Sequence, residues 1–144
     1  GMNGIHHRAP GPVVAAFDNK LVFSELIADG VHVRPEAARL LDPERVILIT
    51  DAMSATGLPD GTFHLGSLAV EVVDGVARTQ SGSLAGSTLT LDVAVRNFAN
   101  WFGSVELAFR AAITNPARAY GLLSPTLDPS TRPLLWSSDL EIQK

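Results

Sequence analysis

Two apolar runs, separated by the signals of a helix, restrict this chain to an α/β fold. The stretch from Leu21 to Val33 opens with eight mostly apolar residues, and residues 45–50 read Arg-Val-Ile-Leu-Ile-Thr. Runs of this kind are typical of strands buried on both faces, as in parallel sheets. Between them, Pro35 and the alanines and leucines that follow predict a helix, which Asp42-Pro43 ends. The order predicts a βαβ unit with parallel strands.

The hydrophobic period changes after the second run. Residues 62–80 alternate between apolar and polar side chains, with turns at 65–67 and at Asp74-Gly75. Asp-Gly between apolar runs is a strong hairpin signal, so we expect a β-hairpin insertion here. Residues 3–12 contain several glycines and prolines and are expected to form a loop before a short helix over 13–17.

Helix signals dominate the chain after residue 86. Ser87 or Thr88 is expected to cap a helix that extends to about Trp101, with Gly103 after its end. Ser104 is expected to cap a helix over 105–114, which Asn-Pro at 115–116 should break before a last turn over 117–120.

A sheet with only two parallel strands leaves two unpaired edges and little cover for such apolar strands. The chain also ends, at residues 140–144, in what reads as the middle of a strand. We therefore expect part of a larger fold, completed by self-association or by a partner chain.

Composition excludes several classes of function. With 46% hydrophobic and 18% charged residues, the chain should fold rather than remain disordered. It has no cysteine, and its net charge of −4 with scattered basic residues argues against a nucleic-acid partner. No run approaches the ~20 apolar residues that span a bilayer, so we expect no membrane association and a cytoplasmic location.

Asp51 is the clearest candidate for chemistry. It follows the second strand directly, and catalytic groups of barrel enzymes lie at the carboxyl ends of parallel strands. Apolar neighbours such as Ile47, Ile49 and Met53 would raise its pKa toward that of a proton shuttle. The alternative is a carboxylate that caps the backbone after the strand.

The other candidates are weaker alone. His32 also follows a strand and could bind a phosphate, a sugar hydroxyl or a metal, or be satisfied by backbone. Arg8, beside His6 and His7, could bind a phosphate or carboxylate, or lie solvated in a loop. A metal site built from the four histidines, His64 included, lacks any ligand spacing typical of a motif. The glycine-bracketed residues 82–86 could present N–H groups to an anion, but a serine nucleophile at Ser87 has no supporting motif.

Taken in order, these segments resemble the C-terminal part of the N-acetylglucosamine-6-phosphate deacetylases, a family of the amidohydrolase superfamily. The resemblance extends from residue 2 to about residue 122. It rests on MNGIHHRAPG (2–11), LIADGVHV (26–33), TDAM (50–53), GLPDG (57–61), GSLAGSTLT (82–90), AVRN (94–97) and TNPARAYGL (114–122).

The resemblance implies a (β/α)8 TIM barrel joined to a small β-sandwich, and metal-dependent release of acetate from N-acetylglucosamine 6-phosphate. It implies that Asp51 is the acid/base residue. It further implies that His32 and Arg8, with His7 beside it, bind the 6-phosphate, with the site of a dimer partner as one location. Gly86 and Ser87 would line the sugar pocket.

The chain also departs from the family pattern in ways that bear on its activity. The family's metal ligands, a glutamate and two histidines, have no counterpart here, so we expect this chain to bind no metal, although the complete enzyme would use a divalent ion such as zinc. Residues 2–122 are interpreted as a partial barrel domain, and 123–144 as the truncated start of the β-sandwich segment. We expect little or no activity from this chain alone; the alternative is a non-catalytic phosphosugar-binding or assembly module.

Overall fold

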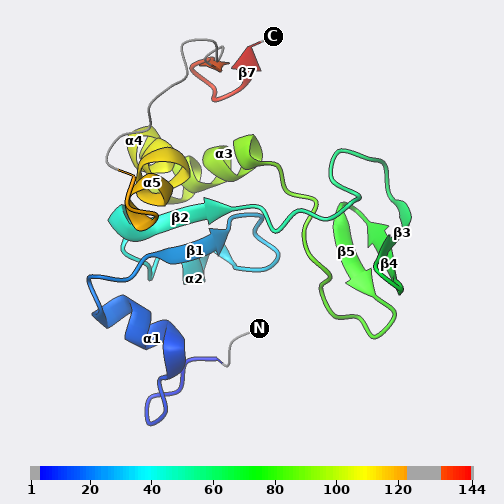
Figure 1. The fold of residues 1–144 in the computed structure, drawn as a ribbon, viewed down its shortest axis with the longest axis horizontal. Coiled ribbons are helices and arrows are strands. Elements are labelled where there is room, and N and C mark those ends of the chain that lie inside the picture. Colours follow the sequence, from blue (N-terminus) through cyan, green and yellow to red (C-terminus); the bar gives the residue numbers. More distant parts are fainter. Residues whose placement is uncertain (1–3, 123–133, 144) are drawn as a thin grey trace.

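The two apolar runs pair as parallel strands in the computed structural model, which describes residues 4–122 and 134–143 (Figure 1). β1 (Ser24–Ile27) and β2 (Val46–Ile49) pair in register from Ser24 opposite Val46 to Ile27 opposite Ile49. Between them lie α2 (Pro35–Ala38) and a 3-10 turn (Pro43–Arg45). The predicted α/β order of strand, helix and parallel strand is confirmed.

The two strands differ in burial. In β2, Val46, Ile47 and Leu48 are buried, as a two-faced strand requires. The same expectation was wrong for the first run, where Leu21 is 91% exposed and Glu25 is exposed. Extended pairing begins only at Ser24, because β2 offers partners over just four residues.

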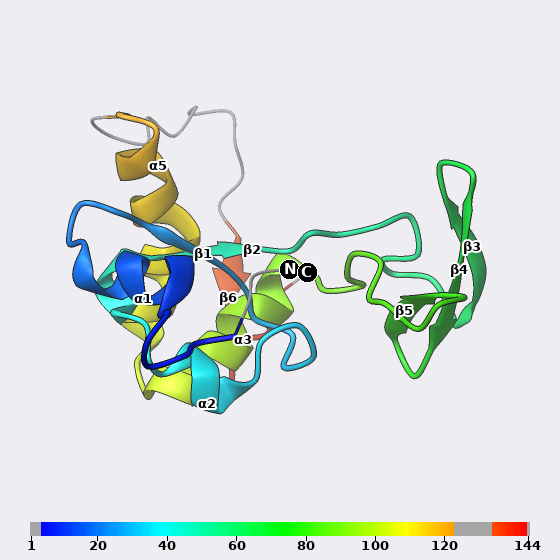
Figure 2. The same ribbon diagram turned by 90° about the horizontal axis from the view of Figure 1, so that it is seen from below.

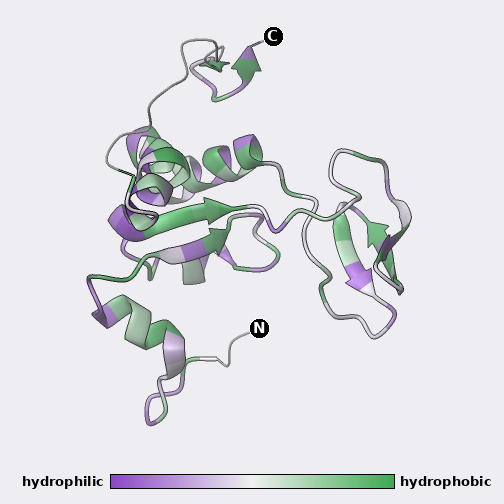
Figure 3. Cartoon of the chain, viewed as in Figure 1, coloured by the Kyte–Doolittle hydropathy of each residue, from purple (hydrophilic) through white to green (hydrophobic). Residues whose placement is uncertain are grey.

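Helices cover one face of this sheet (Figures 1 and 2). They are α3 (Leu91–Phe102), α4 (Val105–Phe109), a π-helical turn (Arg110–Thr114) and α5 (Asn115–Ala119). α1 (Gly11–Asp18) lies beyond the other side of the sheet. Figure 3 shows that β2 is apolar along its length, whereas β1 is apolar only toward its end. The core beneath the helices includes Leu26, Val46, Leu48, Val95 and Phe98.

Two helix boundaries differ from the prediction. α3 begins at Leu91 rather than after Ser87, because Ser87 is instead paired with the segment that follows β2. The expected break at Asn115-Pro116 was also wrong. A π-helical turn precedes Pro116, and the N–H of Asn115 bonds to the carbonyl of Arg110. This wider turn lets the helix continue past a proline that would otherwise clash with the preceding turn.

The alternating segment forms a separate antiparallel sheet to one side of the parallel pair (Figures 1 and 2). Its strands are β3 (Gly61–Leu65), β4 (Leu68–Val73) and β5 (Val76–Thr79). Asp74 and Gly75 both have positive φ, as a type I′ turn requires. The sheet has its own small core of Met53, Ala55, Val70, Val72, Ala77 and Ala85.

The C-terminal segment that the structure describes packs onto the helices. β6 (Leu135–Trp136) pairs antiparallel with β7 (Ile142–Gln143), and the Trp136 ring meets Phe109 edge to face. Residues 123–133 and 144 of the predicted sandwich segment lie outside the described residues. Among the helices of the described ranges, none has the length and apolar character to cross a membrane.

Candidate functional site at the carboxyl ends of the parallel strands

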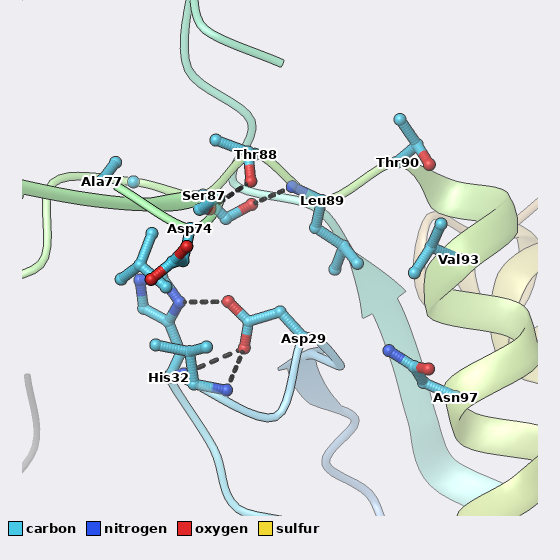
Figure 4. Close-up of a pocket in the computed structure, with 14 residues that line it drawn as sticks. Asp29, His32, Asp74, Ala77, Ser87, Thr88, Leu89, Thr90, Val93 and Asn97 are labelled. Carbon is cyan, nitrogen blue, oxygen red and sulfur yellow. Dashed lines mark hydrogen bonds and ion pairs between the residues drawn. The ribbon is translucent and has the colours of Figure 1, made fainter. Parts of the chain in front are cut away.

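A cavity of about 290 Å³ lies beyond the carboxyl ends of β1 and β2 (Figure 4). Four parts of the chain line it: the loop after β1, the β4–β5 turn, the loop before α3, and α3 itself. The lining side chains that can form polar contacts are Asp29, His32, Asp74, Ser87, Thr88, Thr90 and Asn97.

The loop after β1 is held by one aspartate. Oδ1 of Asp29 accepts the backbone N–H groups of Val31 and His32, both at 2.9 Å. Its Oδ2 lies 2.6 Å from Nδ1 of His32. Both side chains are mostly buried, with exposures of 14% for Asp29 and 17% for His32. The imidazole is therefore fixed at the cavity wall, which fits a binding role for His32.

The loop before α3 docks directly onto the segment that follows β2. The N–H of Ser87 donates to the carbonyl of Asp51 at 2.8 Å, and the N–H of Met53 donates to the carbonyl of Ser87 at 2.9 Å. The Ser87 hydroxyl donates to the carbonyl of Thr50 and accepts the N–H of Leu89 at 3.1 Å. With its hydroxyl engaged on both sides, Ser87 holds the loop in place.

Gly86 allows this close approach. Its φ is +72°, and a Cβ there would lie 3.1 Å from the carbonyl oxygen of Asp51 and 3.3 Å from Cβ of Met53. A side chain would therefore be strained both by the backbone conformation and by contact. Gly86 and Ser87 both line the cavity; that it is the sugar pocket stays a prediction.

Asp51 lies beside this docked loop but differs from expectation in its surroundings. Ile47 and Met53 are buried, yet Asp51 itself is exposed, so the apolar enclosure expected for it was wrong. Its φ of +49° places a non-glycine residue in the left-handed region. Such a conformation persists only where neighbours hold it, and it concentrates at functional sites. Here the hydrogen bond from Ser87 to the Asp51 carbonyl supplies that restraint.

The remaining sequence candidates lie elsewhere. Arg8 and His7 contact each other in the exposed N-terminal loop, with Nη1 of Arg8 2.9 Å from Nε2 of His7. Neither lines the cavity, so the structure does not bring Arg8 and His32 together within one chain. His6 stacks near His7 in the same loop, and His64 is on β3.

Three lining residues were missed from the sequence. Asp29 was considered only as the end of a strand, although Asp-Gly-x-His is a spacing that allows an Asx turn onto the histidine. Asn97 donates to the carbonyl of Ala28 at 2.8 Å and so ties α3 to the end of β1. Asp74 reaches the cavity from the distant sheet, which no local pattern signals.

The start of α3 is stabilised electrostatically near the cavity. A hydrogen bond from the Thr90 side chain lowers the pKa of the Asp92 carboxyl below its usual 3.8. The N–H of Val93 and the charge of Arg96 also lower this pKa, whereas burial raises it. An ionised carboxylate in the first turn also suits the positive end of the helix dipole.

Within residues 4–122 and 134–143, no group of three or more histidine, aspartate or glutamate side chains lies close enough to hold an ion. His6, His7, His32 and Asp51 form no such group, so the described residues do not fit a metal centre.

Comparison with models of known protein families finds no match. Among curated proteins, a putative N-acetylgalactosamine-6-phosphate deacetylase of Escherichia coli K12 is 48% identical over 126 residues, covering 85% of this chain and 75% of the relative. The N-acetylglucosamine-6-phosphate deacetylase of Vibrio furnissii is 47% identical over 126 residues. The chain spans only 32% of that relative's length.

Solved structures give the same result. The N-acetylglucosamine-6-phosphate deacetylase of Thermotoga maritima superimposes with a TM-score of 0.87 at 36% identity, over 97% of this chain and 41% of that one. An aspartate-to-alanine variant of the Mycobacterium smegmatis deacetylase, in complex with N-acetyl-D-glucosamine-6-phosphate, gives 0.85 at 40% identity, over 98% and 40%.

These relatives define one class, deacetylases of 6-phosphorylated N-acetylhexosamines. The chain belongs to the N-acetylglucosamine-6-phosphate deacetylase family, as the sequence resemblance indicated. It corresponds to about 40% of the solved enzymes.

Proposed function

We propose that this chain is the C-terminal part of an enzyme that hydrolyses the amide of an N-acetylhexosamine 6-phosphate, releasing acetate and the hexosamine 6-phosphate. One observation carries the proposal. The loop that contains Gly86 and Ser87 is hydrogen-bonded to the backbone of Asp51, and His32 lies across the same cavity. The pocket loop therefore ties the backbone of Asp51, whose side chain does not line the cavity, to the cavity that His32 lines. Barrel enzymes keep their catalytic groups at this carboxyl edge of the parallel strands.

In this proposal each residue has a separate task. Asp51 takes a proton from the attacking water and returns one to the leaving amine, and its exposure leaves it accessible to both. His32 binds the phosphosugar, and Gly86 and Ser87 limit the width of the sugar pocket. Because Arg8 and His7 lie in an exposed loop away from the cavity, they act on the phosphate in the site of a second copy.

A complete catalytic site needs more than the described residues. The barrel to which β1 and β2 would contribute two strands needs further strands that the described residues do not supply. The divalent metal implied by the family resemblance, with zinc the expected ion, is held by residues that the described part of this chain does not offer. We derive no catalytic step through it. The proposal thus includes little or no turnover by the 144-residue chain alone.

A second function, phosphosugar binding or assembly without catalysis, is favoured by two observations. The cavity and its hydrogen-bonded walls are present in the chain, whereas a three-ligand metal cluster is not found among the described residues. Binding and hydrolysis then differ in one measurable outcome, the release of acetate.

The test measures acetate release and calorimetric binding of N-acetylglucosamine 6-phosphate and N-acetylgalactosamine 6-phosphate, with added zinc. Variants are Asp51→Asn and, as a matched control, Asp18→Asn, an exposed aspartate at the end of α1. Binding without turnover is the expected result for the chain alone. Turnover that Asp51→Asn abolishes and Asp18→Asn retains would support the enzyme and overturn the predicted inactivity. Absence of binding by folded protein would contradict both functions.

A further inference from the structure

The two carboxylate oxygens of Asp29 make different contacts with the loop that carries His32 (Figure 4). Oδ1 accepts the N–H groups of Val31 and His32, so it fixes the backbone of the loop. Oδ2 faces only Nδ1 of the His32 ring, at 2.6 Å. Backbone shape and ring orientation are therefore set by one side chain, through different atoms.

This geometry decides where the ring proton lies. An ionised carboxylate has only acceptor oxygens, so the atom facing Oδ2 must be a protonated nitrogen. Nδ1 of His32 therefore carries the proton, and in the neutral ring Nε2 is left with a lone pair. Among the described residues no hydrogen bond engages Nε2, and His32 lines the cavity, so this nitrogen is available to a ligand.

We infer that Asp29 is a positioning residue that holds His32 in the Nδ1–H tautomer and reserves Nε2 for the ligand in the cavity. The identity of that ligand rests on the proposed function; the tautomer does not. For a phosphosugar, Nε2 takes a proton and binds the 6-phosphate, while Asp29 balances the charge of the resulting imidazolium. Asp29 itself has no contact with the ligand.

Asp29→Asn tests the inference with little change in shape. The amide oxygen can keep both backbone N–H groups, which places the NH₂ group where Oδ2 was. An NH₂ group must meet a lone pair, so Nδ1 has to lose its proton and the ring should convert to the Nε2–H tautomer. The matched control is Asp74→Asn, which changes a second cavity aspartate at a positive φ that asparagine tolerates.

The measurement is a long-range ¹H–¹⁵N correlation spectrum of the ¹⁵N-labelled 144-residue chain, at a pH where the ring signals no longer change with added base. His32→Gln assigns the His32 signals by their loss. We expect Nδ1–H for the wild type and Asp74→Asn, and Nε2–H for Asp29→Asn. An Nε2–H wild type would overturn the inference even if the Asp29 variant failed to fold. Retention of Nδ1–H by a folded Asp29→Asn chain would overturn it as well.

Adding N-acetylglucosamine 6-phosphate to the same samples separates this inference from the proposed function. We expect the wild-type His32 signals to move toward those of the imidazolium, and about tenfold more sugar to be needed for Asp29→Asn, as loss of a charge-assisted hydrogen bond implies. If the tautomers are as expected but no His32 signal responds to the sugar, Asp29 still positions His32 and the proposed ligand is wrong.

Discussion

Substituting Gly86 tests the contact that joins the pocket loop to Asp51. At φ +72°, an alanine costs about 1–2 kcal/mol in the left-handed region. The new Cβ would also lie 3.1 Å from a backbone oxygen and 3.3 Å from Met53 Cβ, neither of which can move without disturbing the end of β2. Overpacking of this kind costs typically about 1–3 kcal/mol.

Gly82 separates the two costs. It lies in the same loop with a φ of +85°, but a Cβ there would meet nothing within 4 Å. Gly82→Ala therefore carries the cost of the backbone conformation alone, offset by about 0.4–1 kcal/mol of lost unfolded-state entropy that both variants share. The difference between the variants isolates the contact with Asp51 and should be about 1–3 kcal/mol.

Urea unfolding measures this difference. With a slope of about 1–3 kcal/mol per M, the midpoint of Gly86→Ala should lie roughly 1 M below that of Gly82→Ala. The Asp51 and Ser87 amide signals should move in Gly86→Ala and stay in place in Gly82→Ala, because the Ser87 N–H bonds to the Asp51 carbonyl. Equal midpoints would refute the reasoning, since the close approach would then carry no energetic weight.

Two further predictions concern the helices. Ser104→Ala removes the hydroxyl that accepts the N–H of Leu107 at 3.2 Å, and should lower the free energy of unfolding by about 1 kcal/mol, measured by denaturant titration. Because the pKa of Asp92 is lowered in the folded state, ionised Asp92 contributes to the free energy of unfolding. This contribution is present above pH 3.8 and is lost as the pH falls through the lowered pKa. Asp92→Asn should therefore be less stable at neutral pH and show a shallower loss in acid; an unchanged acid slope would contradict this.

The parts of the fold that local patterns specify were predictable from sequence. The parallel pair β1 and β2 follows from two apolar runs flanking helix signals, and Gly103 and Ser104 mark a helix end and the next start. The errors arose where distant segments decide the conformation. The helix predicted to begin near Ser87 begins later, because that residue is held by the chain after β2.

The same division applies to the site. Position at a strand end was enough to select Asp51 and His32, because parallel strands share one carboxyl edge. Burial was not predictable, since Asp51 is exposed although Ile47 and Met53, close to it in sequence, are buried. Asp74 could not have been found at all, because the β4–β5 turn reaches the cavity from a separate sheet.

How much of the site can form within this chain depends on which contacts are local. His32 is oriented by Asp29, three residues away, and Ser87 is held by backbone groups of residues 50–53. These contacts lie entirely within the described chain, so the arrangement of His32 and Ser87 forms without another subunit. The side chain of Asp51 is exposed, and the proton transfer that we propose for it would need a further group beside it. Sugar binding should therefore survive in the isolated chain under conditions where hydrolysis does not.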